Sequence, residues 1–178
     1  QGFFGQEAAL LARLTTWQRR LPQGAPTSPA IATLVCYRLD RRLAGLAAHA
    51  GAQYTRYADD ITISGPDQVR KLIPMARKII EEEGFQLAEH KLAVQRRHRQ
   101  QRVTGLIVND RASVPRKVRR RVRAIVHNCA RYGIAHENPK NDPLFTQRVR
   151  GYVEFIRDVH PHEGEQLLAE WKAAQLRR

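Results

Sequence analysis

The sequence predicts an α+β protein in which an antiparallel strand pair packs on helices and an all-helical region follows. Three observations support this fold class. Residues 53–64 hold two short β-prone runs around adjacent carboxylates. Apolar residues recur at helical spacing on both sides of these runs. Beyond residue 110 only helical patterns are visible, so we expect a first region, 1–110, and a second region, 111–178.

The size and composition of the chain exclude several classes. Its 178 residues suit one sizeable domain or two small ones, and its hydrophobic fraction of 42% is typical of packed globular proteins. It has neither an apolar run of about 18 residues nor a signal-peptide pattern, so no membrane association is expected. Because it begins with Gln1 and its one methionine is Met75, we expect a piece of a longer or processed product.

The net charge of +14 points to a nucleic-acid partner. Of the 31 basic residues, 25 are Arg, whose guanidinium binds phosphate through two hydrogen bonds. GC-rich codon usage also favours Arg over Lys, but it does not explain the excess of cations over 17 acids. Cys36 and Cys129 lack ligand-like spacing and fall in apolar helical patterns, so we expect buried free thiols and a reducing cytoplasm.

The first fifty residues predict two helices separated by a loop. Apolar residues at helical spacing predict a helix over Gln6–Arg20. Three prolines and a glycine in Leu21–Pro29 then interrupt regular structure. A second helix is expected from Pro29 to Ala50, with Ser28 as its N-cap.

Residues 53–64 predict a strand, a two-residue turn and a second strand, with Asp59 and Asp60 at the tip. Neighbouring carboxylates repel each other, and each raises the pKa of the other unless a cation neutralises them. Oxygen ligands suit Mg²⁺ or Mn²⁺. The hairpin tip is therefore a candidate metal site, with an ordinary Asp-rich turn as the alternative.

The remainder of the first region mixes helix and strand. One apolar stripe predicts a helix from Pro66 to Glu83, ended by Gly84. Residues 85–87 are expected to form a short strand, residues 94–102 a basic hairpin turn, and residues 103–109 a second strand pair.

The second region predicts three helices, of which the first is strongly basic. Residues 111–131 hold eight cations and no acid, and an apolar stripe predicts an amphipathic helix over Arg116–Arg131. Helices over Pro143–Val159 and Pro161–Leu176 follow a polar loop, Gly133–Asp142. A charge run is often only a solvated face, but cations without acids repel each other unless a polyanion is present. The candidates for phosphate contacts are Arg116, Lys117, Arg119, Arg120, Arg121 and Arg123.

Two motifs in this order resemble those of reverse transcriptases. Residues 21–29, Leu-Pro-Gln-Gly-Ala-Pro-Thr-Ser-Pro, resemble the loop that contacts template and nucleotide. Residues 57–60, Tyr-Ala-Asp-Asp, resemble the metal-binding hairpin. The Val-Thr-Gly at 103–105, with Asn109 and Val-Pro-Arg at 114–116, resembles the bacterial retron-type branch. The resemblance implies that 1–110 is the C-terminal part of a polymerase palm, without fingers or first catalytic strand, and that 111–178 is a helical thumb.

The resemblance also implies roles for individual residues. Asp59 is the expected direct metal ligand, Asp60 a supporting one, and Lys91 or its rival His90 a proton donor to pyrophosphate. An ordinary structural role is the alternative in each case: a plain loop for residues 21–29, a core aromatic for Tyr57, a core strand for residues 103–109 and a surface lysine for Lys91. The template- and substrate-binding candidates are Gln23, Gly24, Ala25, Pro26, Tyr57 and Ala58, and the primer-grip candidates are Val103, Thr104 and Gly105.

The implied activity is RNA-directed DNA polymerisation, in which a structured noncoding RNA is copied into DNA by two-metal nucleotidyl transfer. The implied partners are RNA template and primer, RNA–DNA duplex, dNTP, an N-terminal polymerase segment and an associated effector protein in phage defence. The family has another essential carboxylate before the loop, but Glu7, in a helical pattern, is the one acid preceding Leu21. The chain alone is therefore expected to be incomplete.

Two alternatives remain open from the sequence. The first is a non-catalytic RNA-binding fragment or split subunit. The second is an enzyme of the group II intron or diversity-generating type, against which the Val-Thr-Gly sequence argues.

Overall fold

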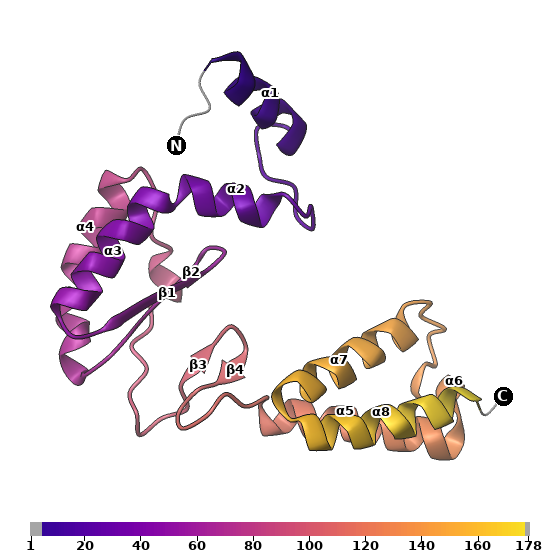
Figure 1. The fold of residues 1–178 in the computed structure, drawn as a ribbon. Helices are drawn as coiled ribbons and strands as arrows, with labels where there is room; N and C mark the ends of the chain where they lie inside the picture. The colour runs from indigo at the N-terminus through magenta and orange to yellow at the C-terminus, as the bar shows by residue number, and fades with distance from the viewer. Residues whose placement is uncertain (1–4, 177–178) are drawn as a thin grey trace. The chain divides into compact units, whose positions relative to one another are not determined.

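The computed structural model describes residues 5–176 and divides into two compact units, Gln1–Val94 and Gln95–Arg178, called here the N-terminal and C-terminal units. Figure 1 shows the order of their elements. The division lies earlier than the expected boundary near residue 110. The reason is that Leu106 packs against the core of the C-terminal helices and Ile107 forms a β-bridge with Ser113.

The N-terminal unit begins with three helices where the sequence predicted two. Helix α1 spans Gln6–Thr15 and ends before the predicted Arg20, because Trp17 and Arg20 exchange two backbone hydrogen bonds of 2.9 Å in a tight turn. The predicted second helix is divided into α2, Ser28–Val35, and α3, Tyr37–His49. The break lies at Cys36, whose ψ of 1° departs from helical geometry.

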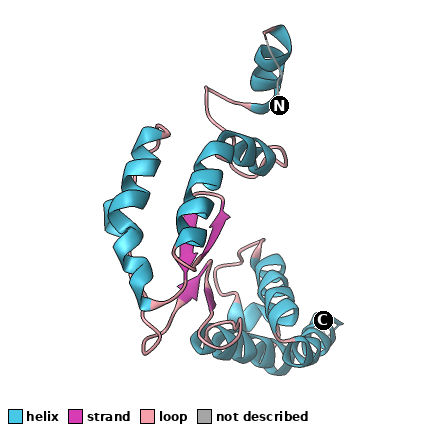
Figure 2. Ribbon diagram, turned by 60° about the vertical axis from the view of Figure 1, so that its left-hand side comes forward, coloured by secondary structure: helices cyan, strands magenta, loops and turns pink. Residues whose placement is uncertain are grey.

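The predicted hairpin is confirmed. Strand β1, Gln53–Tyr57, pairs antiparallel with β2, Asp60–Ser64, and the pairing ends at Tyr57 opposite Asp60. Figure 2 shows these strands lying along α3. Tyr54 of β1 and Ile61 of β2 pack on a buried core. This core is formed by Leu39, Leu43, Ile79 and Ile80.

The helix predicted over Pro66–Glu83 is two elements, a 3₁₀ helix η1, Asp67–Leu72, and the α-helix α4, Ile73–Glu82. Pro74 lacks an N–H and lies in the first turn of α4, which forces a new helix start there. A further 3₁₀ turn, η2, spans Glu89–Lys91. The strand predicted at 85–87 is wrong: Phe85 and Leu87 alternate because both pack on the core, and neither pairs with a strand.

The C-terminal unit opens with a small hairpin. Strand β3, Arg102–Val103, pairs with β4, Leu106–Ile107. Thr104 and Gly105 form its turn with φ of 47° and 86°, the left-handed values that two-residue hairpin loops require. The predicted second strand pair is therefore confirmed, although each strand has only two residues.

Four helices complete this unit. Helix α5, Arg116–Tyr132, matches the predicted basic helix, and a short helix α6, Ile134–Glu137, occupies part of the predicted polar loop. Helices α7, Phe145–Val159, and α8, Pro161–Leu176, follow. Their shared core surrounds the fully buried Trp171.

The result is a mixed α/β chain with two small antiparallel sheets and many helices, as the sequence predicted. Both cysteines are free thiols, Cys129 buried and Cys36 half-buried. Among the helices that the structure describes, none combines the length and the apolar character needed to cross a lipid bilayer.

Candidate functional site

The tip of the β1–β2 hairpin presents two carboxylates. Ala58 and Asp59 form the turn, and Asp60 is the first residue of β2. Both aspartates are exposed, and neither carboxylate has a hydrogen bond or ion pair within residues 5–176. Tyr57 beside them is 71% exposed, so in the described chain it is not a core aromatic. The tip therefore carries an uncompensated pair of negative charges next to an open aromatic ring.

An arginine holds this tip against helix α3. The Nε and Nη2 of Arg56 donate to the two carboxylate oxygens of Asp40 at 2.7 and 2.6 Å, and its Nη1 donates to the carbonyl of Ala58 at 2.8 Å. Tyr54 also donates to Asp40, at 2.6 Å. The hydrogen bonds from Arg56 hold the pKa of the Asp40 carboxyl below its ordinary value, against the opposing effect of burial.

The hydrogen bond from Arg56 to Ala58 stabilises a strained turn. Ala58 has a φ of 52°, a left-handed conformation that a residue with a Cβ adopts at a cost of about 1 kcal/mol. Because Arg56 binds the Ala58 carbonyl, it fixes the peptide that leads into Asp59. Sequence reasoning missed Asp40 and Arg56, since nothing in the local pattern pairs a helix acid with a strand cation.

The Pro/Gly loop forms a folded projection. Ala25 N–H donates to the Pro22 carbonyl at 3.4 Å, closing a β-turn in which Gly24 has a φ of 81°. Ser28 stabilises this turn, because its hydroxyl also donates to the Pro22 carbonyl, at 2.7 Å. The prediction that Ser28 is the N-cap is wrong: Ser28 is the first residue of α2, and the N-cap is Thr27. Gln23 and Gly24 project outward and are exposed.

The hairpin tip fits part of a divalent-metal site. Two neighbouring exposed carboxylates supply the hard oxygen ligands that Mg²⁺ and Mn²⁺ prefer. Within residues 5–176 no cluster of three or more metal-ligating side chains is present, so the described chain offers this pair of carboxylates without a third ligand beside it. Asp59 and Asp60 are thus suitable ligands but do not form a complete set.

Lys91 is not joined to the hairpin tip. It ends the η2 turn and is exposed, with no hydrogen bond or ion pair to Asp59 or Asp60 within the described chain. The adjacent Glu89 pairs with Arg77 of α4, which fixes the turn but not the lysine. His90 is exposed as well.

The outer face of α5 is the second candidate surface. A hollow of about 370 Å³ is lined solely by arginines of this helix. Two of them are ion-paired with an acid that the sequence did not link to them: Arg119 and Arg123 each donate to Glu163 of α8 at 2.6 Å. Burial opposes ionisation of Glu163, but these hydrogen bonds outweigh it and hold the pKa of the carboxyl below its ordinary value. The lining residues are Arg116, Arg119, Arg120 and Arg123.

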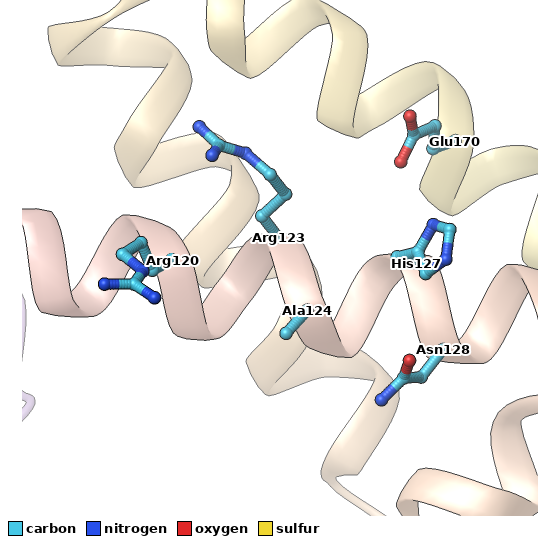
Figure 3. A pocket seen from close by; sticks show the side chains of 6 residues that line it. All are labelled: Arg120, Arg123, Ala124, His127, Asn128 and Glu170. Atoms are coloured by element: carbon cyan, nitrogen blue, oxygen red, sulfur yellow. The ribbon is translucent and has the colours of Figure 1, made fainter.

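This basic face continues into a groove between α5 and α8. Figure 3 shows His127 and Asn128 along α5, following the arginines, with Glu170 of α8 opposite. The groove has a volume of about 400 Å³, and Asn128 donates to Glu137 of α6 at 2.8 Å. His127 and Glu170 were not among the sequence candidates, because a single sequence does not show which helix packs against α5.

The turn of the β3–β4 hairpin is the third surface. Thr104 and Gly105 are exposed, while Val103 is half-buried, so the turn projects and the strand contributes to packing. The structure thus places the hairpin tip and the Pro/Gly loop in the N-terminal unit and both remaining surfaces in the C-terminal unit.

Comparison with known proteins identifies the family of this chain. The family described as reverse transcriptase (RNA-dependent DNA polymerase) matches residues 8–108, which include the Pro/Gly loop, both hairpins and Lys91. This chain belongs to the reverse transcriptase family.

Similar curated reverse transcriptases come from bacterial retrons. The chain is 41% identical over 147 residues to the retron Mx65 reverse transcriptase and 37% identical over 170 residues to the retron Mx162 reverse transcriptase, both of Myxococcus xanthus. It is 32% identical over 168 residues to the retron Ec86 reverse transcriptase of Escherichia coli. These matches cover 82%, 85% and 90% of this chain, but only 33%, 34% and 48% of the respective relatives.

Proposed function

We propose that this chain is the palm-and-thumb portion of a retron-type reverse transcriptase that copies a structured RNA into DNA. The observation that carries the proposal is the hairpin tip, where Asp59 and Asp60 lie exposed and unpaired within the described chain, inside the region that matches the family. Two neighbouring carboxylates supply oxygen ligands of the kind that a divalent cation prefers, and polymerisation is a reaction that uses such a cation.

Asp59 and Asp60 would hold Mg²⁺, or Mn²⁺, together with ligands beyond the described residues. A divalent cation bound there stabilises negative charge on the reacting phosphate. Arg56 keeps the turn in place through its bond to Ala58. The exposed ring of Tyr57 provides a flat surface for a base or sugar at the primer end.

The Pro/Gly loop and the C-terminal unit would position nucleic acid. Gln23 and Gly24 lie in a turn that hydrogen bonds hold in shape. The absence of a side chain at Gly24 would let a base pair or nucleotide approach the backbone. The face of α5 would bind phosphates of the RNA–DNA duplex, and the β3–β4 turn would contact the primer. Phosphate contacts of this kind set the position of a duplex but do not read its sequence.

Several finer assignments belong to the same proposal. Lys91 would serve as proton donor to pyrophosphate if bound substrate brings the two together, since within the described chain it has no hydrogen bond or ion pair to either aspartate. The partners are a structured noncoding RNA, dNTP, the remainder of the polymerase and an effector protein of phage defence, in a reducing cytoplasm that suits the free Cys36 and Cys129.

An RNA-binding subunit without chemistry of its own is the second candidate. The observation in its favour is that the described residues supply two metal ligands and no third. It predicts RNA binding that does not depend on Asp59 or Asp60.

The test is primer extension by the complete polymerase that contains this chain, with an RNA template, an annealed DNA primer, dNTPs and Mg²⁺. The proposal predicts DNA products that extend to the end of the template. It also predicts that synthesis ceases when a chelator removes the metal. RNA binding without any extension, under conditions where the protein is folded, would contradict it and favour the binding subunit.

A further inference from the structure

An arginine-rich loop outside the surfaces described so far is held in a defined shape. This segment, residues 95–102, is called here the Arg loop. It contains four arginines, one histidine, three glutamines and no acid. All of its residues are exposed except Gln101, which is half-buried, and it belongs to the C-terminal unit.

Asn109, which follows the β3–β4 hairpin, holds the middle of the Arg loop through three hydrogen bonds. Its Nδ2 donates to the carbonyls of Arg97 and Arg99 at 3.1 and 2.8 Å. Its Oδ1 accepts from the N–H of Gln101 at 2.9 Å. One amide side chain thus bonds three backbone groups of a segment with almost no regular structure of its own.

Gln95 closes the loop at its base. Its Nε2 donates to the carbonyl of Arg102 at 2.9 Å, and its Oε1 accepts from the N–H of the same residue. Gln101 donates back to the carbonyl of Gln95 at 3.0 Å. Because amide side chains make these bonds, the guanidinium groups of Arg96, Arg97 and Arg99 are not used to hold the loop.

The charge of the Arg loop is not compensated. Within residues 5–176, none of its arginines or His98 forms an ion pair, whereas Arg119 and Arg123 of α5 share Glu163. Arg102 has only a neutral partner, Gln100. Fixing like charges close together costs free energy that an external polyanion recovers.

The composition of the Arg loop favours nucleic acid over protein as the polyanion. A protein interface needs aromatic or apolar side chains at its centre, and the loop has none. Guanidinium groups match the geometry of phosphate oxygens. A loop that is already ordered also loses little conformational entropy when it binds.

We propose that the Arg loop is a separate binding site for the phosphate backbone of the structured RNA, with Asn109 and Gln95 as the residues that hold its shape. The proposal rests on the proposed function, because it assigns one surface to the RNA partner of the polymerase. Arg96, Arg97 and Arg99 supply the contacts, in addition to those expected from α5.

The test compares two triple variants of the complete polymerase. The first replaces Arg96, Arg97 and Arg99 with Gln. The control removes the same charge from exposed cations without ion pairs in the described chain, by replacing Lys71, Lys140 and Lys172 with Gln. Affinity for a structured RNA hairpin is measured at several salt concentrations. The loop variant should bind more weakly and reduce the slope of log affinity against log salt by about 2 to 3, since each lost phosphate contact contributes about 0.7–0.9.

A third variant separates shape from charge. Asn109→Ala leaves every arginine in place but removes three hydrogen bonds to the loop. It should speed cleavage by trypsin at Arg97 and Arg99 and weaken RNA binding, while the salt slope stays near that of the wild type. RNA affinity equal to the wild type, despite faster cleavage, would overturn the role of the fixed shape.

The outcomes distinguish this proposal from the proposed function. If the wild-type polymerase extends a primer on a short unstructured template and binds the hairpin, but the loop variant matches the control in affinity and slope, then the Arg loop is not an RNA site. If the wild type neither extends a primer nor binds the hairpin, both proposals are overturned.

Discussion

Arg56 and Asp40 form a bidentate ion pair that joins the β1–β2 hairpin to helix α3. The two hydrogen bonds measure 2.7 and 2.6 Å, and the side chain of Arg56 is only 8% exposed. The remaining guanidinium nitrogen binds the carbonyl of Ala58, next to Asp59. One side chain therefore links the position of a helix to the conformation of the turn that presents the carboxylates.

Replacing Arg56 with Ala should reduce turnover more than substrate affinity. Without its third hydrogen bond the strained peptide at Ala58 is free to relax, and Asp59 moves with it. Small displacements of reacting groups cost up to about 100-fold in rate. Steady-state kinetics on the complete polymerase should show kcat lowered at least tenfold and KM for dNTP changed less.

Arg70→Ala is the matched control, because Arg70 is exposed in the same unit and has no ion pair in the described chain. It should leave kcat unchanged. If Arg56→Ala and Arg70→Ala behave alike, Arg56 does not position the site. Hydrogen exchange of β1 amides provides the structural readout, and it should accelerate in the Arg56 variant alone.

Gly164→Ala should destabilise the C-terminal unit. A Cβ at Gly164 of α8 would overlap the backbone of Arg157 in α7, so the two helices would have to separate. Overpacking of this kind costs about 1–3 kcal/mol. Urea unfolding followed by fluorescence of the buried Trp171 measures the change.

Gly151→Ala provides the comparison on α7, since a Cβ there meets nothing within 4 Å. It should raise the free energy of unfolding by about 0.5–1 kcal/mol through its better helix propensity. Equal effects of the two substitutions would show that helix contact does not require a glycine at 164.

The stability of the C-terminal unit should fall as the pH drops below about 6.5. Val114 N–H donates to Nε2 of His160 at 3.2 Å, so this ring nitrogen must be unprotonated. Burial lowers the pKa of His160, and the charge of Arg119 adds to that effect. The stabilising contribution is thus complete above the unfolded-state pKa of about 6.5 and is lost as the pH falls through the lower folded-state pKa.

His160→Gln should flatten this dependence between pH 7 and pH 5, as measured by urea unfolding with Trp171 fluorescence. His162→Gln changes an exposed histidine two residues away and should leave the pH profile as it is. A wild-type stability that does not change over this range would argue against a neutral His160 ring in the folded state.

Glu163→Gln should strengthen nucleic-acid binding while it weakens the fold. Neutralising this carboxylate frees Arg119 and Arg123, so the dependence of RNA affinity on salt should steepen by up to about 2 in slope. Glu165→Gln removes the same charge, but Glu165 is exposed and has only a long ion pair to Arg157 at 3.9 Å. Identical salt dependence in both variants would mean that the arginines freed from Glu163 do not reach phosphate.

The sequence predicted the local elements that carry strong periodic signals. The period-two pattern of residues 61–64 predicted β2, and the apolar stripe of Arg116–Arg131 predicted α5, which ends one residue later at Tyr132. The strand expected at 85–87 did not form, because alternation also arises when two side chains pack on one core. The break at Cys36 carries no glycine or proline and had no sequence signal.

Local sequence patterns did not predict contacts between residues that are distant in the chain. Sequence reasoning placed Asp59 and Asp60 at a hairpin tip, but not the Asp40–Arg56 ion pair that supports it. It described the cations of α5 as lacking any acid, whereas Glu163 reaches them from α8. Such pairs depend on how helices and strands pack, which a single sequence does not specify.

The most direct test of the account replaces Asp59 with Asn in the complete polymerase and measures single-turnover primer extension on an RNA template. Asn keeps the size of the side chain but removes the charge that a divalent metal requires. Asp67→Asn, at an exposed aspartate in the same unit, is the matched control. The account predicts loss of extension by at least 100-fold for Asp59→Asn, with RNA affinity retained and Asp67→Asn as active as the wild type. Extension by Asp59→Asn at the wild-type rate would contradict it.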